Sequence, residues 1–174
     1  MNRITANAFA QFPFQFNFFQ IAYVTTDLDQ AARAMGALFG IERFQINRDV
    51  AIETSAGVAQ AHFALAFVGS QQIEIIQPAG GADGAYRDIL PGVGYALRMH
   101  HAGHLATRAA DWAQIDLAVR TSGYTTPVGG VFRRDEVALM HYMYADTRQV
   151  IGHYLEFMYQ TDAGRDMFAQ VPRY

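Results

Sequence analysis

Two kinds of hydrophobic spacing alternate along this chain, and the first change of spacing defines its first structural unit. Residues 18–24 are an apolar run rich in aromatic and β-branched side chains, which are typical of a half-buried strand. Thr26 followed by Asp29 is a weak capping box, and apolar residues then recur at helical spacing as far as Gly40. The pattern predicts a strand that leads into a helix with Thr26 at its start.

The same order of elements recurs in the second half of the chain. Residues 98–105 read as another strand, a helical apolar face follows, and Gly123 ends it. Gly123 follows Gly40 at nearly the distance in sequence at which His101 follows Gln20. We interpret this near-constant offset as two copies of one unit.

Each predicted helix is followed by three more predicted strands. In the first unit these cover residues 41–46, 62–68 and 71–77, and in the second they cover residues 125–132, 137–145 and 153–159, with a turn at residues 146–148. Each unit is therefore β-α-β-β-β. The expected fold class is α+β, with paired βαβββ modules that form a curled mixed sheet.

Breaks in composition divide the chain into five segments. They are an N-terminal arm (1–17), a first βαβββ module (18–80), a connecting loop (81–97) with a short helix at 85–90, a second βαβββ module (98–160) and a C-terminal tail (161–174). In the arm, Phe12, Phe14 and Phe16 alternate with other residues, which indicates an extended segment that packs on its own core or on another subunit. We therefore expect a homodimer. The tail is expected to form a short helix around residues 164–168 and to lie on the surface.

Composition excludes several classes of function. A net charge of −3 and a pI near 6.0 provide no electrostatic footprint for nucleic acid, and the longest basic run is Arg133-Arg134. Such a pair in a loop is typical of a solvated surface, although at the mouth of a site it could hold an acidic substrate. The absence of cysteine excludes disulfides and thiolate metal sites. No apolar run reaches the roughly 18 residues of a membrane helix, so no membrane partner is expected and a cytoplasmic location is the default expectation.

Two carboxylates lie inside apolar strands, where an unpaired charge is costly. Glu74 interrupts the apolar run 73–76, and Glu156 interrupts the run 154–158. Desolvating a charge without a partner costs several kcal/mol, so each must face water or be paired. Their separation again matches the repeat offset. Four residues therefore occupy equivalent places in the two units: Gln20, Glu74, His101 and Glu156.

If the two units curl into a half-barrel, these four side chains can converge on one point. One imidazole, two carboxylates and an amide oxygen form a nitrogen and oxygen ligand set for a divalent metal, with room for water or substrate. Without thiolates the set suits Zn²⁺, Ni²⁺, Co²⁺, Mn²⁺ or Fe²⁺, among which the sequence does not discriminate.

Four short signatures in register carry a resemblance to a known superfamily. They are residues 20–24 ahead of 26–29, residues 73–75, the pair His100-His101, and residues 154–156. In these the chain resembles the glyoxalase, bleomycin-resistance and extradiol-dioxygenase superfamily, known for vicinal oxygen chelation and built from paired βαβββ modules. The resemblance covers roughly residues 18–160. It implies an open metal site with Gln20, Glu74, His101 and Glu156 at the four ligand positions.

Within that superfamily the four residues resemble two groups of enzymes in particular. Glyoxalase I enzymes carry His or Gln at the first ligand position and Glu, His and Glu at the others, and methylmalonyl-CoA epimerases share the matched His101 and Glu156. Both remove a proton next to a carbonyl, which needs a base and a Lewis acid. The resemblance implies Glu156 as the base and Glu74 as a ligand or second base. The expected function is a metal-dependent lyase or isomerase acting on a small carbonyl or thioester substrate.

Two other functions fit the same fold. A non-catalytic protein of the bleomycin-resistance type would bind a small molecule in an aromatic-lined cleft without any metal. Extradiol dioxygenases use two histidines and one glutamate for iron, and Gln20 at the first histidine position argues against that chemistry. Each of the four residues taken singly also has an ordinary explanation: Gln20 as a strand-edge amide, the two glutamates as solvent-facing carboxylates, and His101 as a surface histidine or a core one with its nitrogens satisfied. Their repeated spacing favours the metal site.

Overall fold

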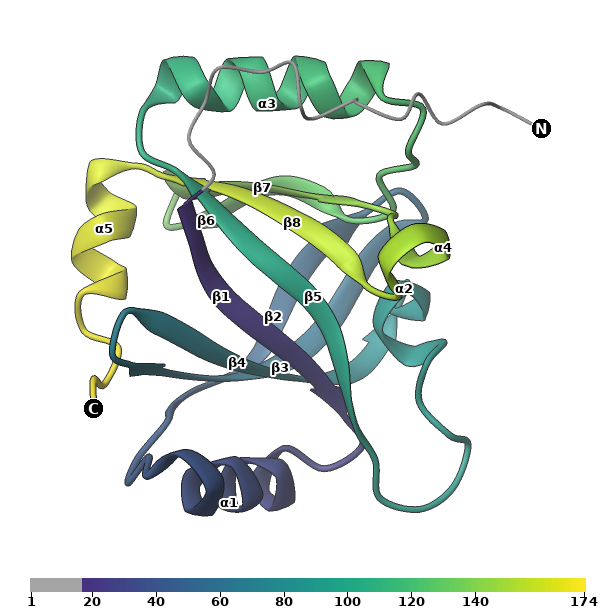
Figure 1. Ribbon diagram of the computed structural model, residues 1–174, viewed down its shortest axis with the longest axis vertical. Coiled ribbons are helices and arrows are strands. Elements are labelled where there is room, and N and C mark those ends of the chain that lie inside the picture. The colour runs from purple at the N-terminus through teal and green to yellow at the C-terminus, as the bar shows by residue number, and fades with distance from the viewer. Residues whose placement is uncertain (1–16) are drawn as a thin grey trace.

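The computed structural model describes residues 17–174 and contains one eight-stranded mixed sheet (Figure 1). Its strands are β1 (Asn17–Thr25), β2 (Gln45–Thr54), β3 (Gly57–Val68), β4 (Gln71–Gly81), β5 (Leu97–Ala106), β6 (Gly129–Arg134), β7 (Val137–Ala145) and β8 (Tyr154–Gln160). The helices are α1 (Leu28–Phe39), α2 (Gly84–Arg87), α3 (Ala109–Thr121), α4 (Arg148–Ile151) and α5 (Asp162–Phe168). None of these helices is long and apolar enough to cross a bilayer.

The strand order has an internal symmetry about its centre. The order is β2-β3-β4-β1-β5-β8-β7-β6, with β1 and β5 antiparallel in the middle. On either side, β1 pairs with β4 and β5 pairs with β8, both in parallel, and the outer strands are antiparallel. This arrangement confirms the predicted α+β class and the curled mixed sheet. The segment limits at residues 80 and 98 stay predictions.

The sheet curls until its two outer strands meet. An isolated antiparallel bridge joins Thr54 to Val128, and the Ser55 amide donates a hydrogen bond to the Pro127 carbonyl at 2.9 Å. The hydroxyl of Tyr142 on β7 also accepts a hydrogen bond from the backbone amide of Glu53 on β2 at 3.0 Å. The concave side of the sheet is therefore enclosed by both halves of one chain.

The two long helices cover the outer side of the sheet. Figure 1 shows α1 and α3 beyond opposite ends of the curled sheet. The apolar face of α1 packs on β3 and β4 through Leu28, Ala31 and Met35, and α3 packs on β5, β7 and β8 through Ile115 and Val119. A third apolar cluster lies on the inner side. Because both helices pack on the outer side, neither of them covers the inner side.

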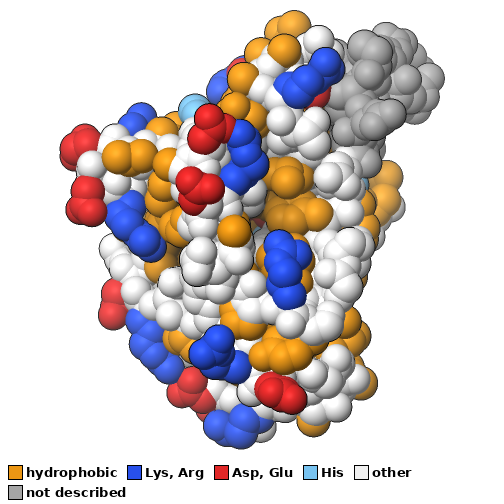
Figure 2. All heavy atoms as spheres, turned by 90° about the vertical axis from the view of Figure 1, so that its left-hand side faces the viewer, with side chains coloured by type: hydrophobic (Ala, Val, Ile, Leu, Met, Phe, Trp, Pro, Cys, Tyr) orange, Lys and Arg blue, Asp and Glu red, His pale blue; other side chains and the backbone are white. Residues whose placement is uncertain are grey.

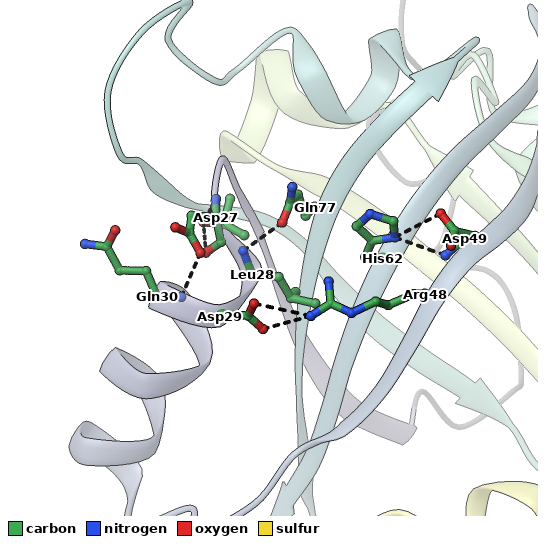
Figure 3. A network of polar contacts seen from close by, with 9 residues as sticks. Asp27, Leu28, Asp29, Gln30, Arg48, Asp49, His62 and Gln77 are labelled. Atoms are coloured by element: carbon green, nitrogen blue, oxygen red, sulfur yellow. Dashed lines mark hydrogen bonds and ion pairs between the residues drawn. The ribbon is translucent and has the colours of Figure 1, made fainter.

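The start of α1 differs from its prediction by one residue. Asp27, not Thr26, is the N-cap, and its side chain accepts a hydrogen bond from the Gln30 amide at 2.9 Å (Figure 3). Thr26 instead accepts a hydrogen bond from the Ala96 amide at 3.0 Å. The Thr26 hydroxyl thus links the end of β1 to the residue before β5, a long-range contact that local spacing does not reveal.

The strand after α1 was predicted in the wrong place. Residues 41–44 are outside any strand, and Ile41 is buried against the helix with its amide donating to the Gly36 carbonyl at 3.0 Å. The strand is β2, at residues 45–54, and most of its side chains are exposed or half-exposed. Ile52 is the one buried residue of this edge strand, so the strand shows little apolar alternation, which is why the pattern missed it.

Other boundaries also differ from the prediction. Strands β3 and β4 are longer than predicted, β6 begins at Gly129 rather than residue 125, and the predicted turn at 146–148 leads into the short helix α4. Arg133 and Arg134 therefore end a strand and do not lie in a loop. The predicted helices at 85–90 and 164–168 are present as α2 and α5.

The C-terminal tail is more than a surface segment. Val171 is buried, Arg173 bridges to Phe67, and the Arg173 guanidinium lies 3.9 Å from the centre of the Phe67 ring. The last residue closes the contact, because the Tyr174 hydroxyl accepts a hydrogen bond from the Arg43 amide at 2.8 Å. The arm residues Phe12, Phe14 and Phe16 lie outside the described residues, so the homodimer stays a prediction.

Gly164 is expected to be essential for the contact between α5 and β7. A Cβ there would overlap the Leu139 carbonyl oxygen, which as part of a strand cannot move aside. We expect Gly164→Ala to lower the free energy of unfolding by roughly 1–3 kcal/mol, measured by urea denaturation. Gly92→Ala is the matched control, because an added Cβ there meets nothing within 4 Å. Equal loss in both variants would contradict the packing argument.

Candidate metal centre

The four predicted site residues come from the four central strands of the sheet. Pairing between strands places Ala22 of β1 opposite both Glu74 and His101, and Gly103 of β5 opposite both Gln20 and Glu156. Residues directly opposite one another, and residues two apart on a strand, share a face of the sheet. All four side chains therefore point to the concave side.

The structure brings the four side chains together around one ring nitrogen. His101 Nε2 lies 2.9 Å from Glu156 Oε2, 3.3 Å from Glu74 Oε2 and 3.3 Å from Gln20 Oε1. His101 is fully buried, and the other three side chains are buried as well. The convergence predicted for the four residues is what the geometry shows.

Small residues make room for this convergence. Ala22 is fully buried between Glu74 and His101, and Gly103 lies between Gln20 and Glu156. A Cβ on Gly103 would lie 2.6 Å from Gln20 Oε1 and 2.8 Å from Gln20 Cβ. The glycine is needed for the close approach of a neighbouring side chain.

A buried residue outside the predicted set orients Gln20. Gln72 lies on β4 directly opposite Gln20, and its Oε1 accepts a hydrogen bond from Gln20 Nε2 at 2.7 Å. With its nitrogen held in this way, the Gln20 amide turns its oxygen toward His101. The sequence offered a weak signal for Gln72, since it precedes Glu74 by two residues and therefore shares its face.

His100 is a second residue to which the sequence assigned no role in the site. Residues 21 to 24 of β1 pair regularly with β5 except at one point: Ala22 lies opposite His101 and Tyr23 opposite Met99, so His100 is the extra residue of a β-bulge. A bulge re-aims a side chain that would otherwise alternate to the other face. His100 Nδ1 consequently lies 2.9 Å from His101 Nδ1, and its Nε2 lies 2.9 Å from the Ala85 carbonyl oxygen.

Burial and charge set the protonation of the group. Burial acts to lower the pKa of His101, but Glu156 and Glu74 outweigh it and raise that pKa to about 9. Burial raises the pKa of Glu156 in spite of the opposing charge of His101. Burial, aided by the charge of His101, lowers the pKa of His100 to about 3. Without a metal, the group therefore holds a proton on His101 at neutral pH.

The donor set fits a divalent metal ion. Glu74, His101 and Glu156 each offer one ligand atom, and these atoms lie within 4.8 Å of one another. The contact between His101 and Glu156 does not have hydrogen-bond geometry, so Glu156 Oε2 is buried without a hydrogen bond from any described residue. A buried carboxylate oxygen in that position is suited to a cation. Gln20 Oε1 adds a fourth ligand atom, the third oxygen, on the same side.

A cavity of about 750 Å³ opens onto this group. Gln20, Glu74 and Glu156 belong to its lining, and most of the wall is apolar, with Phe19, Phe63, Leu65, Met140, Met158 and Phe168. Arg48, Arg133 and Arg134 complete the lining from the edge strands β2 and β6. On the face shown in Figure 2, the surface is hollowed near its centre, with hydrophobic side chains in the hollow and basic ones beside it. The size and lining are those of a small-molecule site.

Two further carboxylates line the cavity, Asp49 and Glu53 of β2. Glu53 on β2 was not predicted, because the sequence pattern placed the strand elsewhere. Its backbone amide donates to the Tyr142 hydroxyl at 3.0 Å. Burial is the main reason that the pKa of Tyr142 rises to about 12, and the charges of Glu53 and Glu156 act in the same direction. Tyr142 therefore stays protonated, and its hydroxyl can donate a hydrogen bond to a ligand in the cavity.

Comparison with known proteins places this fold and site in a family. A sequence model described as the glyoxalase/bleomycin resistance protein/dioxygenase superfamily matches residues 19–135. This match covers more than half of the chain, which therefore belongs to that superfamily. In a sequence comparison with curated proteins, none matches the chain.

Solved structures share the fold at low sequence identity. A variant of Streptomyces coelicolor methylmalonyl-CoA epimerase in complex with 2-nitronate-propionyl-CoA has a TM-score of 0.56 and 17% identity, over 86% of this chain and 98% of that one. Methylmalonyl-CoA epimerase from Mycobacterium tuberculosis has a TM-score of 0.53 and 12% identity, over 83% and 87%. A mutant of 4-hydroxymandelate synthase from Streptomyces coelicolor has a TM-score of 0.50 and 13% identity, over 84% and 49%. At these identities the likeness shows the fold.

Gly103→Ala is expected to disturb the centre specifically through Gln20. The added Cβ would lie too close to both Oε1 and Cβ of Gln20. The Gln20 side chain must therefore shift, and its amide moves away from His101. We expect a loss of roughly 1–3 kcal/mol in the free energy of unfolding and weaker binding of Zn²⁺. Urea denaturation and calorimetric titration with Zn²⁺ measure the two effects, with Gly92→Ala as the control. Wild-type stability and affinity in Gly103→Ala would contradict the role assigned to Gly103.

Proposed function

We propose that this protein is a metal-dependent lyase or isomerase that removes a proton next to the carbonyl of a small carbonyl compound or thioester. One observation carries the proposal: His101, Glu74, Glu156 and Gln20 converge at a cavity large enough for such a substrate. Membership of a superfamily that contains lyases, isomerases and dioxygenases supports it.

In this proposal Gln20, Glu74, His101 and Glu156 hold a divalent ion, one of Zn²⁺, Ni²⁺, Co²⁺, Mn²⁺ or Fe²⁺. When bound, such an ion supplies Lewis acidity at the substrate carbonyl oxygen. Glu156 takes the proton from the neighbouring carbon, since it lines the cavity and its Oε2 has no hydrogen-bond partner among the described residues. Glu74 is a ligand or a second base. The Tyr142 hydroxyl orients the substrate as a hydrogen-bond donor.

The rim of the cavity favours a substrate that carries an acidic group. Arg48 is already paired with Asp29 at 3.0 Å (Figure 3), and Arg133 donates to the Glu136 carbonyl at 3.3 Å. Arg134 makes no ion pair with any described residue. The two arginines at the end of β6 are thus available to a carboxylate or phosphate on the substrate. Structural neighbours named as methylmalonyl-CoA epimerases make acyl thioesters a natural first substrate panel.

A binding protein without catalysis is the second candidate. The apolar walls of the cavity favour it, because they would hold an aromatic or aliphatic ligand without any ion. A ring-cleaving dioxygenase is a third candidate, for which oxygen consumption with a catechol would be the evidence. The experiments below separate the first two.

We expect the protein purified without chelator to carry about one divalent ion per chain and to bind Zn²⁺ more tightly as pH rises. The pKa of His101 near 9 means that the ion must displace a proton from Nε2 at neutral pH. The apparent affinity therefore rises about tenfold per pH unit up to about pH 9 and then levels off. Elemental analysis determines the ion content, and calorimetry in buffers of different ionisation enthalpy measures the released proton.

Matched glutamate variants control that measurement. Glu74→Gln and Glu156→Gln each remove one charge from the centre, and both are expected to bind Zn²⁺ more weakly. Glu42→Gln makes the same change at an exposed residue outside the cavity lining and is expected to bind like wild type. A folded wild type that takes up none of the five ions would overturn the metal-dependent function and favour the binding protein.

Glu156→Gln is expected to abolish proton removal while keeping an oxygen ligand in place. Loss of a general base typically lowers turnover by a factor of about 100 to 10,000. Exchange of the substrate α-proton in D₂O, followed by NMR over α-hydroxycarbonyl compounds and acyl thioesters, measures this step directly. Comparison with Glu42→Gln, at matched ion content, separates loss of the base from loss of the ion. Wild-type exchange in Glu156→Gln would show that another group is the base.

A further inference from the structure

The segment that connects β4 to β5 contacts His100, which in turn contacts His101 of the candidate metal centre. Ala85 and Tyr86 lie on α2, in the segment between β4 and β5. The Ala85 carbonyl oxygen lies 2.9 Å from His100 Nε2, and the Tyr86 ring stacks on the His100 ring with centroids 5.1 Å apart. His100 is itself almost completely buried. It stands between α2 and His101.

The hydrogen bonds of His100 fix its own tautomer and require a proton on Nδ1 of His101. A carbonyl oxygen can only accept, so the proton of His100 must be on Nε2, facing Ala85. His100 Nδ1 is then a lone pair, and His101 Nδ1, at 2.9 Å, must donate to it. This leaves Nε2 of His101 as the atom that faces Glu74, Glu156 and Gln20. The direction of both bonds follows from one backbone carbonyl.

The Ala85 carbonyl, which accepts the hydrogen bond from His100, is itself held in place. Asp83 accepts a hydrogen bond from the Gly80 amide at 2.9 Å and is paired with Arg87, so both ends of α2 are tied together. The Tyr86 side chain is buried against His100 and Tyr144. Segment 83–87 therefore holds the acceptor in place and is itself tied to the end of β4.

We propose that His100 is a positioning residue, which holds His101 in the Nδ1–H tautomer so that Nε2 is presented to the metal ion, and that α2 anchors it through Ala85. The inference rests on the proposed function, because it assigns a role toward the same ion. The geometry supports it: a β-bulge places His100 on the face of His101, where strand alternation would have pointed it away. Partners of this kind are generally needed for full metal affinity.

Three variants test this role. His100→Phe keeps a ring for stacking on Tyr86 but removes both hydrogen bonds, and it is expected to weaken Zn²⁺ binding about 10-fold to 100-fold. His100→Gln keeps an acceptor and an N–H donor in one planar group, and it is expected to restore most of that affinity. His104→Phe makes the same substitution on the same strand, at a ring stacked on Phe157 rather than on the centre, and is expected to bind like wild type. Competition with a chromophoric chelator measures each affinity.

A second measurement needs no metal and no substrate. Long-range ¹H–¹⁵N correlation spectra of the metal-free wild type report which ring nitrogens carry protons. We expect His100 to be protonated at Nε2 alone and His101 to carry a proton on Nδ1. A proton on His100 Nδ1 would reverse the direction of the bond between the rings and overturn the inference.

The outcomes distinguish this inference from the proposed function. A wild type that binds Zn²⁺ together with an equally tight His100→Phe variant overturns the positioning role alone. Equal losses in His100→Phe and His100→Gln also overturn it, because they would indicate packing rather than hydrogen bonding. A folded wild type that binds no ion overturns both. Weak binding in His100→Phe, recovery in His100→Gln and the expected tautomers support the role.

Discussion

A buried imidazole that faces two buried carboxylates is the interaction on which the rest of this structure depends. Removing such charges from water costs several kcal/mol per group unless an opposite charge or a cation compensates. His101 compensates Glu74 and Glu156 only while the four central strands keep their register. The small residues Ala22 and Gly103, and the helices that pack outside the sheet, all serve that condition.

The two halves of the chain orient their ligand residues, Gln20 and His101, through different polar partners. Gln20 and His101 occupy equivalent places, and each is oriented by a second buried polar side chain. Gln72 holds the amide nitrogen of Gln20 within the regular register of β4, whereas His100 reaches His101 only because β5 has a bulge. The two halves therefore share the same arrangement of strands, and they differ in how the ligand atom of Gln20 or His101 is oriented. That difference makes the centre asymmetric, with a single imidazole.

Closure of the sheet turns this polar group into the inner part of a cavity. Because the outer strands β2 and β6 meet, one chain supplies all four converging residues and both edges of the opening. Burial of the four side chains lowers the local dielectric constant, which strengthens electrostatic interactions among them. The edge strands contribute Arg48, Arg133 and Arg134 to the lining together with Asp49 and Glu53, so charges of both signs lie at the opening.

The sequence by itself determined the fold class, the repeated unit and the residues that converge, namely Gln20, Glu74, His101 and Glu156. Hydrophobic period and repeat spacing can be read along the chain without knowing which strands pair. It did not determine the partners that orient them. The bulge at His100, the bond from Gln20 to Gln72 and the course of β2 depend on which strands lie side by side. Such contacts join residues far apart in sequence and leave no periodic trace, so only the tertiary structure decided them.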